Sequence, residues 1–328
     1  MLPTFKHPNL YQGYKKERNY FEGWYYKIVD RSSQHSYAII PGIFRGPSDH
    51  EHESFVQVLD GKSKTNMYLR YGVDHFKARR NETVFNVANH EFSIRYIKMN
   101  HYDGNYQILG ELRFVDVIPW PDSLLRPGSM GFYNFLPIPF RYQVICLYGE
   151  IVGSLLINNK EIDFTGGKVY IEKMWGKNYP RNYLWLQTAD FPFPGTALSC
   201  RISRSKVMGI KRYLFFTAFY HDEKVYQFTT LNRSKLKVEE LYRQFKLTFT
   251  YQDLELKIIM SYKPEEFVEW QGPYDGRLTL PVKQLLTGQV RVELTDLFKN
   301  KVLFTGIGES AMLEIKGQFN PQDKDHHQ

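Results

Sequence analysis

The sequence predicts an almost all-β protein built from two tandem antiparallel β-barrels with few short helices. Apolar and polar residues alternate with period two along much of the chain, as they do in half-buried strands. Aromatic residues, which favour pleated strands, make up 16% of the sequence. The length of 328 residues exceeds that of a usual single domain, and each half is long enough to bury its own core.

Alternating segments follow one another at hairpin spacing in the first third of the chain. We expect them to form the first barrel, within residues 1–118. These segments are residues 24–30, 37–45, 53–59, 91–97 and 106–115.

A stretch rich in proline and glycine follows. Seven such residues interrupt residues 116–140 and forbid regular structure there. We therefore expect a linker at residues 119–140, a second barrel at residues 141–319, and a polar tail that frays at residues 320–328.

Alternation resumes after this stretch. Asn158 and Asn159, which tolerate the positive φ of a tight turn, join two strand candidates, 142–157 and 161–164. The main helix candidate is residues 236–245, whose apolar spacing fits a helix. Single helical turns are expected at residues 175–179 and 264–270, and further strands at residues 168–173, 183–188, 213–220, 224–231, 245–251, 255–262, 288–294, 301–306 and 312–317.

The formal net charge of +8 raises the question of a nucleic-acid surface. The densest basic stretch, residues 201–212, lies between expected strands and is interpreted as a solvated hairpin end, so nucleic acid is not an expected partner. A basic surface also suits peripheral contact with an anionic membrane, which stays open for a lipid-handling protein.

The compartment is inferred from targeting signals and cysteines. The first 16 residues lack the apolar segment of a secretory signal and the pattern of a transit peptide, and no apolar run is long enough to span a bilayer. Cys146 and Cys200 both lie in strand-like segments, which favours buried reduced thiols, although a single bridge between them stays open. We expect a cytoplasmic protein.

Common catalytic signatures are absent from the sequence: it has no Gly-rich phosphate loop, Ser nucleophile elbow, zinc-type cysteine pair or HExxH helix. His50 and His52, in the segment DHEHE at residues 49–53, place imidazoles beside carboxylates as in metal sites. Such a pair needs further ligands from elsewhere, and because none can be assigned, we expect no metal.

The first distinctive string is YFEGWYYK at residues 20–27. On a strand, Glu22, Trp24 and Tyr26 project from one face, which aligns a carboxylate with two large rings. Glu22 is therefore a candidate acid. The alternative is a packed strand in which Glu22 pairs with a cation, and residue chemistry alone favours that alternative.

The second string is YIEKMWGKNYPRNYLWLQ at residues 170–187. A strand, a tight loop and a returning strand are expected, with Tyr170 and Glu172 on one face and Trp185 and Gln187 on one face of the next strand. The alternative is a barrel corner plugged by an indole, with the acid and the cation neutralised at the rim. The group that this string is expected to gather comprises Glu172, Lys173, Trp175, Trp185 and Gln187.

Together, these strings resemble the tocopherol cyclase family. FEGWYYK is followed far downstream by Tyr-x-Glu-Lys-x-Trp-Gly, then aromatic-Pro, then Trp-x-Gln. The likeness extends to residues 142–164 and, less sharply, to residues 222–228 and 288–317. It implies two lipocalin-like barrels, with a more distant link to carotenoid hydratases and related proteins that act on polyenes or isoprenoids.

Two positions depart from the family pattern. Met174 stands where the family usually has Asn before Trp-Gly, and Tyr179 precedes Pro180 where the family usually has Phe. The first departure removes a polar group that is suited to orienting a substrate.

The resemblance implies acid-catalysed cyclisation or hydration of a prenylated quinol or isoprenoid, without a cofactor. An acid protonates a prenyl double bond, and a hydroxyl group captures the tertiary cation. This chemistry needs a protonated carboxyl group in apolar surroundings, aromatic rings near the cation, and exclusion of water. The assignments implied are Glu172 as proton donor with Glu22 as its rival, Trp24, Trp175 and Trp185 as cation-stabilising walls, Lys173 with Gln187 as hydroxyl-orienting groups, and Tyr26 and Tyr170 as further substrate contacts.

Two other hypotheses stay open. The same fold could carry an isoprenoid, quinone or fatty acid without turnover, because lipocalin-like folds do not imply catalysis. In both cases the expected partner is an apolar small molecule. A glycan-binding or protein-interaction module would instead show exposed aromatic residues and no enclosed cavity.

Overall fold

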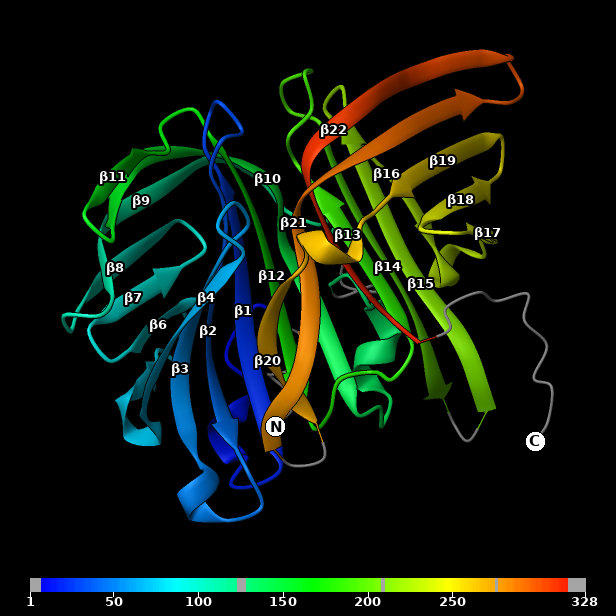
Figure 1. Ribbon diagram of the computed structural model, residues 1–328. Helices are drawn as coiled ribbons and strands as arrows, with labels where there is room; N and C mark the ends of the chain where they lie inside the picture. Colours follow the sequence, from blue (N-terminus) through cyan, green and yellow to red (C-terminus); the bar gives the residue numbers. More distant parts are fainter. Residues whose placement is uncertain (1–6, 123–127, 208–209, 275–276, 318–328) are drawn as a thin grey trace. The chain divides into compact units, whose positions relative to one another are not determined.

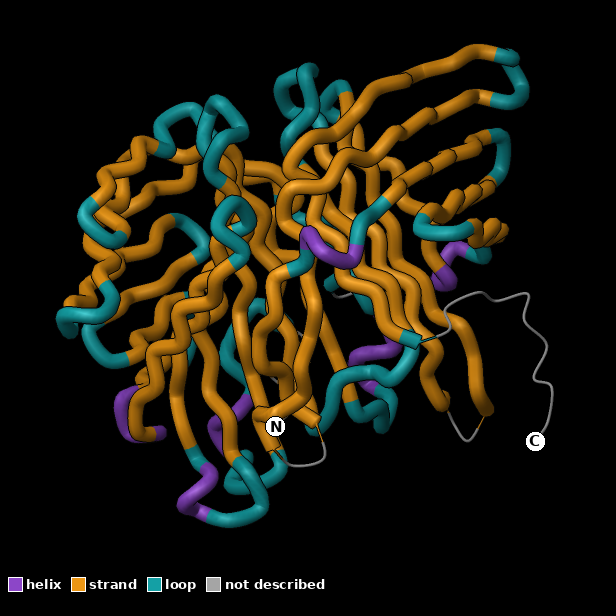
Figure 2. Tube along the Cα trace, in the orientation of Figure 1, coloured by secondary structure: helices purple, strands orange, loops and turns teal. Residues whose placement is uncertain are grey.

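The computed structural model describes residues 7–122, 128–207, 210–274 and 277–317. Strands dominate this part of the chain, and its helical segments are short 3-10 turns, the longest being η4 (Gly131–Phe135) (Figure 2). The all-β prediction is confirmed. None of the helices described here has the length and apolarity needed to cross a membrane. The expected tail at residues 320–328 lies outside the described residues.

The first antiparallel sheet is nearly closed into a barrel. Its first strand, β1 (Tyr20–Val29), pairs with its last, β12 (Lys168–Gly176) (Figure 1). The edge strands β4 (Thr65–Gly72) and β5 (Phe76–Ala78) are consecutive in the chain, so the short turn η3 (Val73–His75) brings the two edges together. The strands between are β2 (Ser36–Arg45) and β3 (Glu53–Asp60) on one side, and β10 (Phe140–Ile157), β9 (Gln107–Ile118), β8 (Tyr96–Tyr102), β7 (His90–Ser93) and β6 (Val84–Val87) on the other, with β11 (Lys160–Asp163) paired to β10.

The second antiparallel sheet repeats this strand order. Its first strand, β13 (Tyr183–Thr188), pairs with its last, β22 (Lys301–Lys316). The edges β16 (Lys224–Thr229) and β17 (Lys235–Leu241) are again consecutive and joined by one turn, η5 (Thr230–Asn232). The other strands are β14 (Ala197–Val207), β15 (Ile210–His221), β18 (Gln244–Tyr251), β19 (Leu254–Ser261) and β21 (Arg277–Asp296), with β20 (Val268–Tyr274) paired to β21.

The chain divides into two compact units: Met1–Tyr179 with Val268–Lys283, and Pro180–Phe267 with Gln284–Gln328. This differs from the linker expected at residues 119–140, because β10, β11 and β12 belong to the first sheet. The Pro/Gly-rich stretch connects β9 to β10, which are neighbours in that sheet. Its composition indicates a long connection, but composition says nothing of where the next strand pairs.

The helix prediction for residues 236–245 is wrong. This segment forms β17, a turn and the start of β18, with Arg243 at a φ of 56° in the turn. Val238 and Phe245 point into the core, and Val238 lies opposite Leu247 of β18. The apolar spacing of so short a segment fits both periods, and strand pairing decides between them. Of the two single turns expected, the one at residues 264–270 is present as η6 (Pro264–Glu266), which is followed by β20. The turn expected at residues 175–179 is not helical, because β12 continues to Gly176 and bends follow it.

Each unit has its own apolar core, formed by the inward-facing alternate residues of its strands. Trp24, Phe85 and Phe92 belong to the core of the first unit, and Phe219 and Phe249 belong to that of the second. Both cysteines are unpaired and buried in these cores, as the sequence predicted: Cys146 and Cys200.

Candidate functional site

The first distinctive string and the start of the second place an acid and two indoles on one face of the first sheet. In the antiparallel pairing of β1 with β12, Glu22 lies opposite Trp175, and Trp24 lies opposite Lys173. Directly opposed residues of paired strands share a face of the sheet. Trp24 belongs to the core cluster and stacks on Phe85 at a centroid distance of 3.9 Å, so this face points into the barrel.

Lys173 and Glu22 form a fully buried ion pair. The Lys173 Nζ lies 2.6 Å from Glu22 Oε1, and both side chains are inaccessible to solvent. The same ammonium group donates to the carbonyl oxygens of Pro8, at 2.9 Å, and of Leu10. Each of its three N–H donors therefore has an acceptor. The indole ring of Trp175 lies 4.6 Å from it, and that of Trp24 lies 5.4 Å away.

The Glu22 carboxylate is surrounded by hydrogen donors. The backbone N–H of Gln12 donates to Oε1 at 3.0 Å and to Oε2 at 2.9 Å, and the Tyr20 hydroxyl donates to Oε2. Burial raises the pKa of Glu22, and Lys173 opposes this rise by stabilising the charge. Burial likewise lowers the pKa of Lys173, against the effect of Glu22. The group thus fastens residues 8–12 onto the β1–β12 pair, and we call it the clamp (Glu22, Lys173, Gln12, Tyr20).

Glu172 projects from the opposite face of β12. It lies opposite Tyr25 of β1, and its side chain is fully buried. The Tyr170 hydroxyl, on the same face of β12, donates to Glu172 Oε2 at 2.6 Å. The shared face of Tyr170 and Glu172 agrees with the sequence pattern. The expected grouping of Glu172 with Lys173 and Trp175 does not form, because successive strand residues alternate between faces.

Trp185 lies in the second unit, in a row of buried polar groups. It is opposite Arg201 of β14 and Glu314 of β22. The guanidinium carbon of Arg201 lies 4.4 Å from the centre of the indole ring. Glu314 accepts hydrogen bonds from the Tyr183 hydroxyl and from Gln284 Nε2, the latter at 2.9 Å. The row occupies the face of β13 opposite the one that enters the core.

Sequence reasoning missed Arg201 and Glu314. Arg201 was expected in a solvated hairpin end, which is wrong, because its side chain is 2% exposed and lies in the β14–β15 pair. A single charged residue between apolar strand neighbours is the signal that would have found both. Gln187, which the sequence did predict, is buried two residues after Trp185 on the same face of β13.

The remaining predicted residues have structural partners. The Tyr26 hydroxyl donates to the backbone oxygen of Ser93 at 3.2 Å inside the first unit. Glu51 of the DHEHE segment accepts from Ser48 and caps the turn η2 (Asp49–Glu51). Among the described residues, no three His, Cys, Asp or Glu side chains are grouped so that they could hold a metal ion.

The two departures from the family pattern contact each other. The Tyr179 hydroxyl lies 2.8 Å from the sulfur of Met174, and its ring packs on Phe21 and Phe140. A Phe at position 179 would leave the Met174 sulfur without this contact. Met174 lies on β12, the strand that carries Glu172, so the two positions form one local contact at the end of that strand.

Solved structures similar to this chain share its fold at low sequence identity. CghA with Sch210972 has a TM-score of 0.55 at 10% identity, covering 90% of this chain and 88% of that one. Kievitone hydratase from Nectria haematococca has a TM-score of 0.50 at 10% identity, with 94% of each chain covered. A putative AttH from Nitrosomonas europaea has a TM-score of 0.53 at 11% identity, covering 90% and 92%. No curated protein matches the chain in sequence.

The family comparison covers most of the chain. The family described as Tocopherol cyclase-like matches residues 110–317. This range includes the string at residues 170–187, with Tyr170 and Glu172, and the strands of the second sheet, whereas Glu22 and Trp24 precede it. By this match, the chain belongs to the tocopherol cyclase-like family.

Proposed function

We propose that this protein is a cofactor-independent cyclase or hydratase that protonates a prenyl double bond, with a prenylated quinol as the expected substrate class. Membership of the tocopherol cyclase-like family supports acid chemistry on an isoprenoid. A hydratase among the proteins of similar fold agrees with water as an alternative nucleophile. The observation that carries the proposal is Glu172, a fully buried carboxyl group held by Tyr170 within the matched range.

The proposed step conserves every atom of the substrate. The Glu172 carboxyl group gives its proton to the less substituted carbon of the double bond, and a tertiary carbocation forms. The quinol oxygen then bonds to that carbon and releases its proton to the carboxylate, which restores the acid. Because Tyr170 donates to Oε2, the proposal assigns the transferable proton to Oε1. In hydration, a water molecule replaces the quinol oxygen.

The geometry favours Glu172 over Glu22 as the acid. Every neighbour of Glu22 within the clamp donates a hydrogen bond to it, which stabilises the ionised form and leaves no proton aimed at a substrate. Trp24 and Trp175 face the ammonium group of Lys173, so in this proposal they belong with the clamp. Trp185 and Gln187 belong to the second unit, and this proposed step assigns them no role.

Parallel variants of the two acids test the proposal. Glu172→Gln keeps the volume and the Tyr170 hydrogen bond but has no proton to give, so turnover of a polyprenylated methylhydroquinone should fall by about 100- to 10,000-fold. Its melting temperature should stay close to that of the unmodified protein. Glu22→Gln should instead lower the melting temperature. Unchanged turnover in the Glu172 variant would end this assignment.

A carrier function is the second candidate. The interior of the first unit favours this function, because most of its side chains are apolar. In addition, the ammonium group of Lys173 in the clamp already has acceptors for its hydrogen bonds within the protein. A carrier would co-purify with an isoprenoid, quinone or fatty acid and would release it unchanged. Extraction of bound lipid followed by mass spectrometry, together with the turnover assay, separates the two candidates.

A further inference from the structure

Three polar side chains from three strands meet inside the first unit. Tyr71 of β4 lies on the same face as the core residues Met67 and Leu69, and His90 of β7 lies on the face of the core residue Phe92. His101 of β8 continues the inward face of Met99. The Tyr71 hydroxyl lies 3.1 Å from His90 Nε2 and 3.3 Å from His101 Nδ1.

One backbone donor determines the proton positions along this group. The N–H of Asn100 donates to His90 Nδ1 at 3.1 Å, so the proton of neutral His90 is on Nε2 and points to Tyr71. Tyr71 therefore donates to His101 Nδ1. The proton of His101 is then on Nε2, which lies 3.3 Å from the carboxylate of Asp103. The bond from Asn100 requires the His90 imidazole to be neutral.

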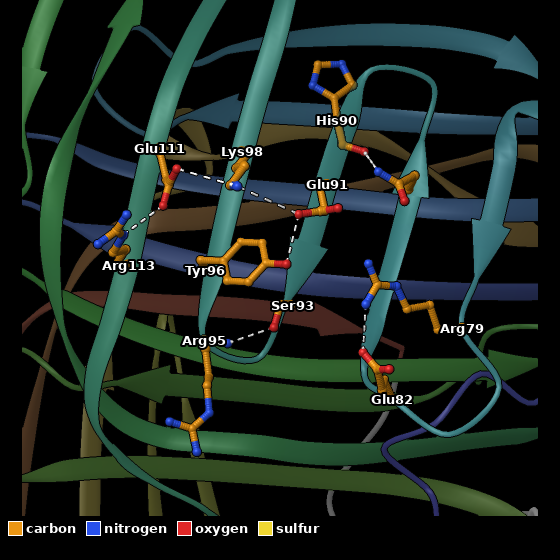
Figure 3. Close-up of polar contacts among 11 residues, drawn as sticks. Arg79, Glu82, His90, Glu91, Ser93, Arg95, Tyr96, Lys98, Glu111 and Arg113 are labelled. Carbon is orange, nitrogen blue, oxygen red and sulfur yellow. Dashed lines mark hydrogen bonds and ion pairs between the residues drawn. The ribbon is translucent and has the colours of Figure 1, made fainter.

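The hydrogen bond from Asn100 to His90 lies where the neighbouring strands β7 and β8 share few backbone pairs. β7 and β8 pair through only two opposed positions, Glu91 with Lys98 and Phe92 with Ile97. By contrast, β8 pairs with β9 through seven. On the outer face, the Tyr96 hydroxyl of β8 donates to Glu91 of β7 at 2.8 Å, and Lys98 lies 3.9 Å from Glu91 and also near Glu111 (Figure 3). The imidazole of His90 thus supplies a further connection where backbone pairing stops.

We propose that the hydrogen bond between Asn100 of β8 and the His90 imidazole of β7 holds these two strands of the first barrel together. Protonation of His90 breaks this bond and allows β7 and β8 to separate. A proton on Nδ1 puts two N–H donors face to face, and the Asn100 bond is lost. This inference does not depend on the proposed enzymatic function.

The neighbours of His90 oppose its protonation. The groups around it are Tyr71 from β4, His75 from η3, whose ring lies 6.3 Å from that of Tyr71, and His101 from β8. The carboxylate of Asp103 lies beside His101 rather than His90. Glu91 and Lys98 project from the outer face of the sheet, away from the His90 ring. Burial, with a contribution from His101, lowers the pKa of His90 to about 4. The closed wall is therefore stable at neutral pH and becomes less stable as the pH falls from about 6.5 toward 4.

Hydrogen exchange of the Asn100 amide tests the proposal. With a free-histidine pKa near 6.5 and a closed-state pKa near 4, opening should increase on the order of 50-fold between pH 7 and pH 4.5, after correction for intrinsic exchange. The amide of Ile39, in β2 and buried in the core of the first unit, serves as the reference for unfolding of that whole unit. The ¹⁵N shifts of the His90 ring should show the Nε2–H tautomer at pH 7.

Two matched variants complete the design. His90→Gln offers a carbonyl oxygen to Asn100 that does not titrate in this range, so the acid dependence should disappear. His75→Gln should retain it. The proposal is overturned if Asn100 protection is constant down to pH 4.5, if Ile39 loses protection in parallel, or if the His90 proton is found on Nδ1. All three of these measurements use the unmodified protein, so they decide the matter even if the His90 variant does not fold.

Discussion

Replacing Lys173 by methionine removes the cation of the clamp and keeps most of its aliphatic volume. Glu22 is then left as a buried carboxylate without its ion-pair partner 2.6 Å away, and the carbonyl oxygens of Pro8 and Leu10 lose a shared donor. Breaking a buried ion pair in this way costs about 3 to 5 kcal/mol of unfolding free energy. Lys173→Met should therefore be among the most destabilising single changes in the first unit.

The same variant should respond to pH with a defined sign. Without Lys173, burial raises the pKa of Glu22 further, because the group that stabilised its charge is gone. The folded state then binds a proton more readily than the unfolded state. The destabilisation should therefore shrink as the pH falls toward 5, and Glu22→Gln combined with Lys173→Met should lose less than the sum of the two single losses.

Urea unfolding followed by tryptophan fluorescence measures these losses. Lys168→Met, on the same strand, is the matched control, because Lys168 pairs with Glu150 at 3.4 Å while the two side chains are 20% and 38% exposed. Such a surface pair contributes about 1 kcal/mol or less. If Lys173→Met and Lys168→Met unfold at the same urea concentration, the clamp does not stabilise the fold as argued.

Three further outcomes are expected. Burial raises the pKa of Cys200 to about 12 and that of Cys146 further still, so neither thiol should react with a thiol reagent at pH 8 until the protein is unfolded, as counting labelled thiols by mass spectrometry would show. Glu314→Ala should cost about 1 to 3 kcal/mol in thermal unfolding, because it leaves the amide of Gln284 and a tyrosine hydroxyl without their acceptor, whereas Glu314→Gln should cost less. Gly176→Ala should lower the free energy of unfolding by about 1 to 3 kcal/mol, because φ is 148° at this residue and a Cβ would overlap a neighbouring backbone carbonyl. An unchanged melting temperature would contradict this expectation.

Alternation predicted many of the strands because it reports directly on half-buried pleated surfaces, but β4, β14 and β20 lie outside the predicted strands and β17 was predicted as helix. The faces of Glu22 and Trp24, and of Tyr170 and Glu172, followed from period two alone. The same rule separates Glu172 from Lys173, which were expected together because they are adjacent in the chain.

Other features could not be inferred from local pattern. Two acceptors of Lys173 are backbone carbonyls at residues 8 and 10, which carry no side-chain signature. The division of the chain depends on β12 pairing back to β1, a contact between residues some 150 positions apart that no local segment encodes. Composition located a long connection at residues 119–140, and the pairing of its flanking strands decided the architecture.

The three crossings of the chain between its two units bear on how the protein can be made. Residues 268–283 belong to the first unit, and Gln57 of β3 is hydrogen-bonded through both its amide nitrogen and its amide oxygen to the backbone of Gln271. The first unit is therefore incomplete when the ribosome has translated residues 1–179, and it stays so until residue 283 has left the exit tunnel. All strands of the first sheet end by Gly176, so they can pair early, but residues 268–283 join the first unit only after residues 180–267 of the other unit have been made. The first unit therefore cannot be completed before synthesis of the second has begun.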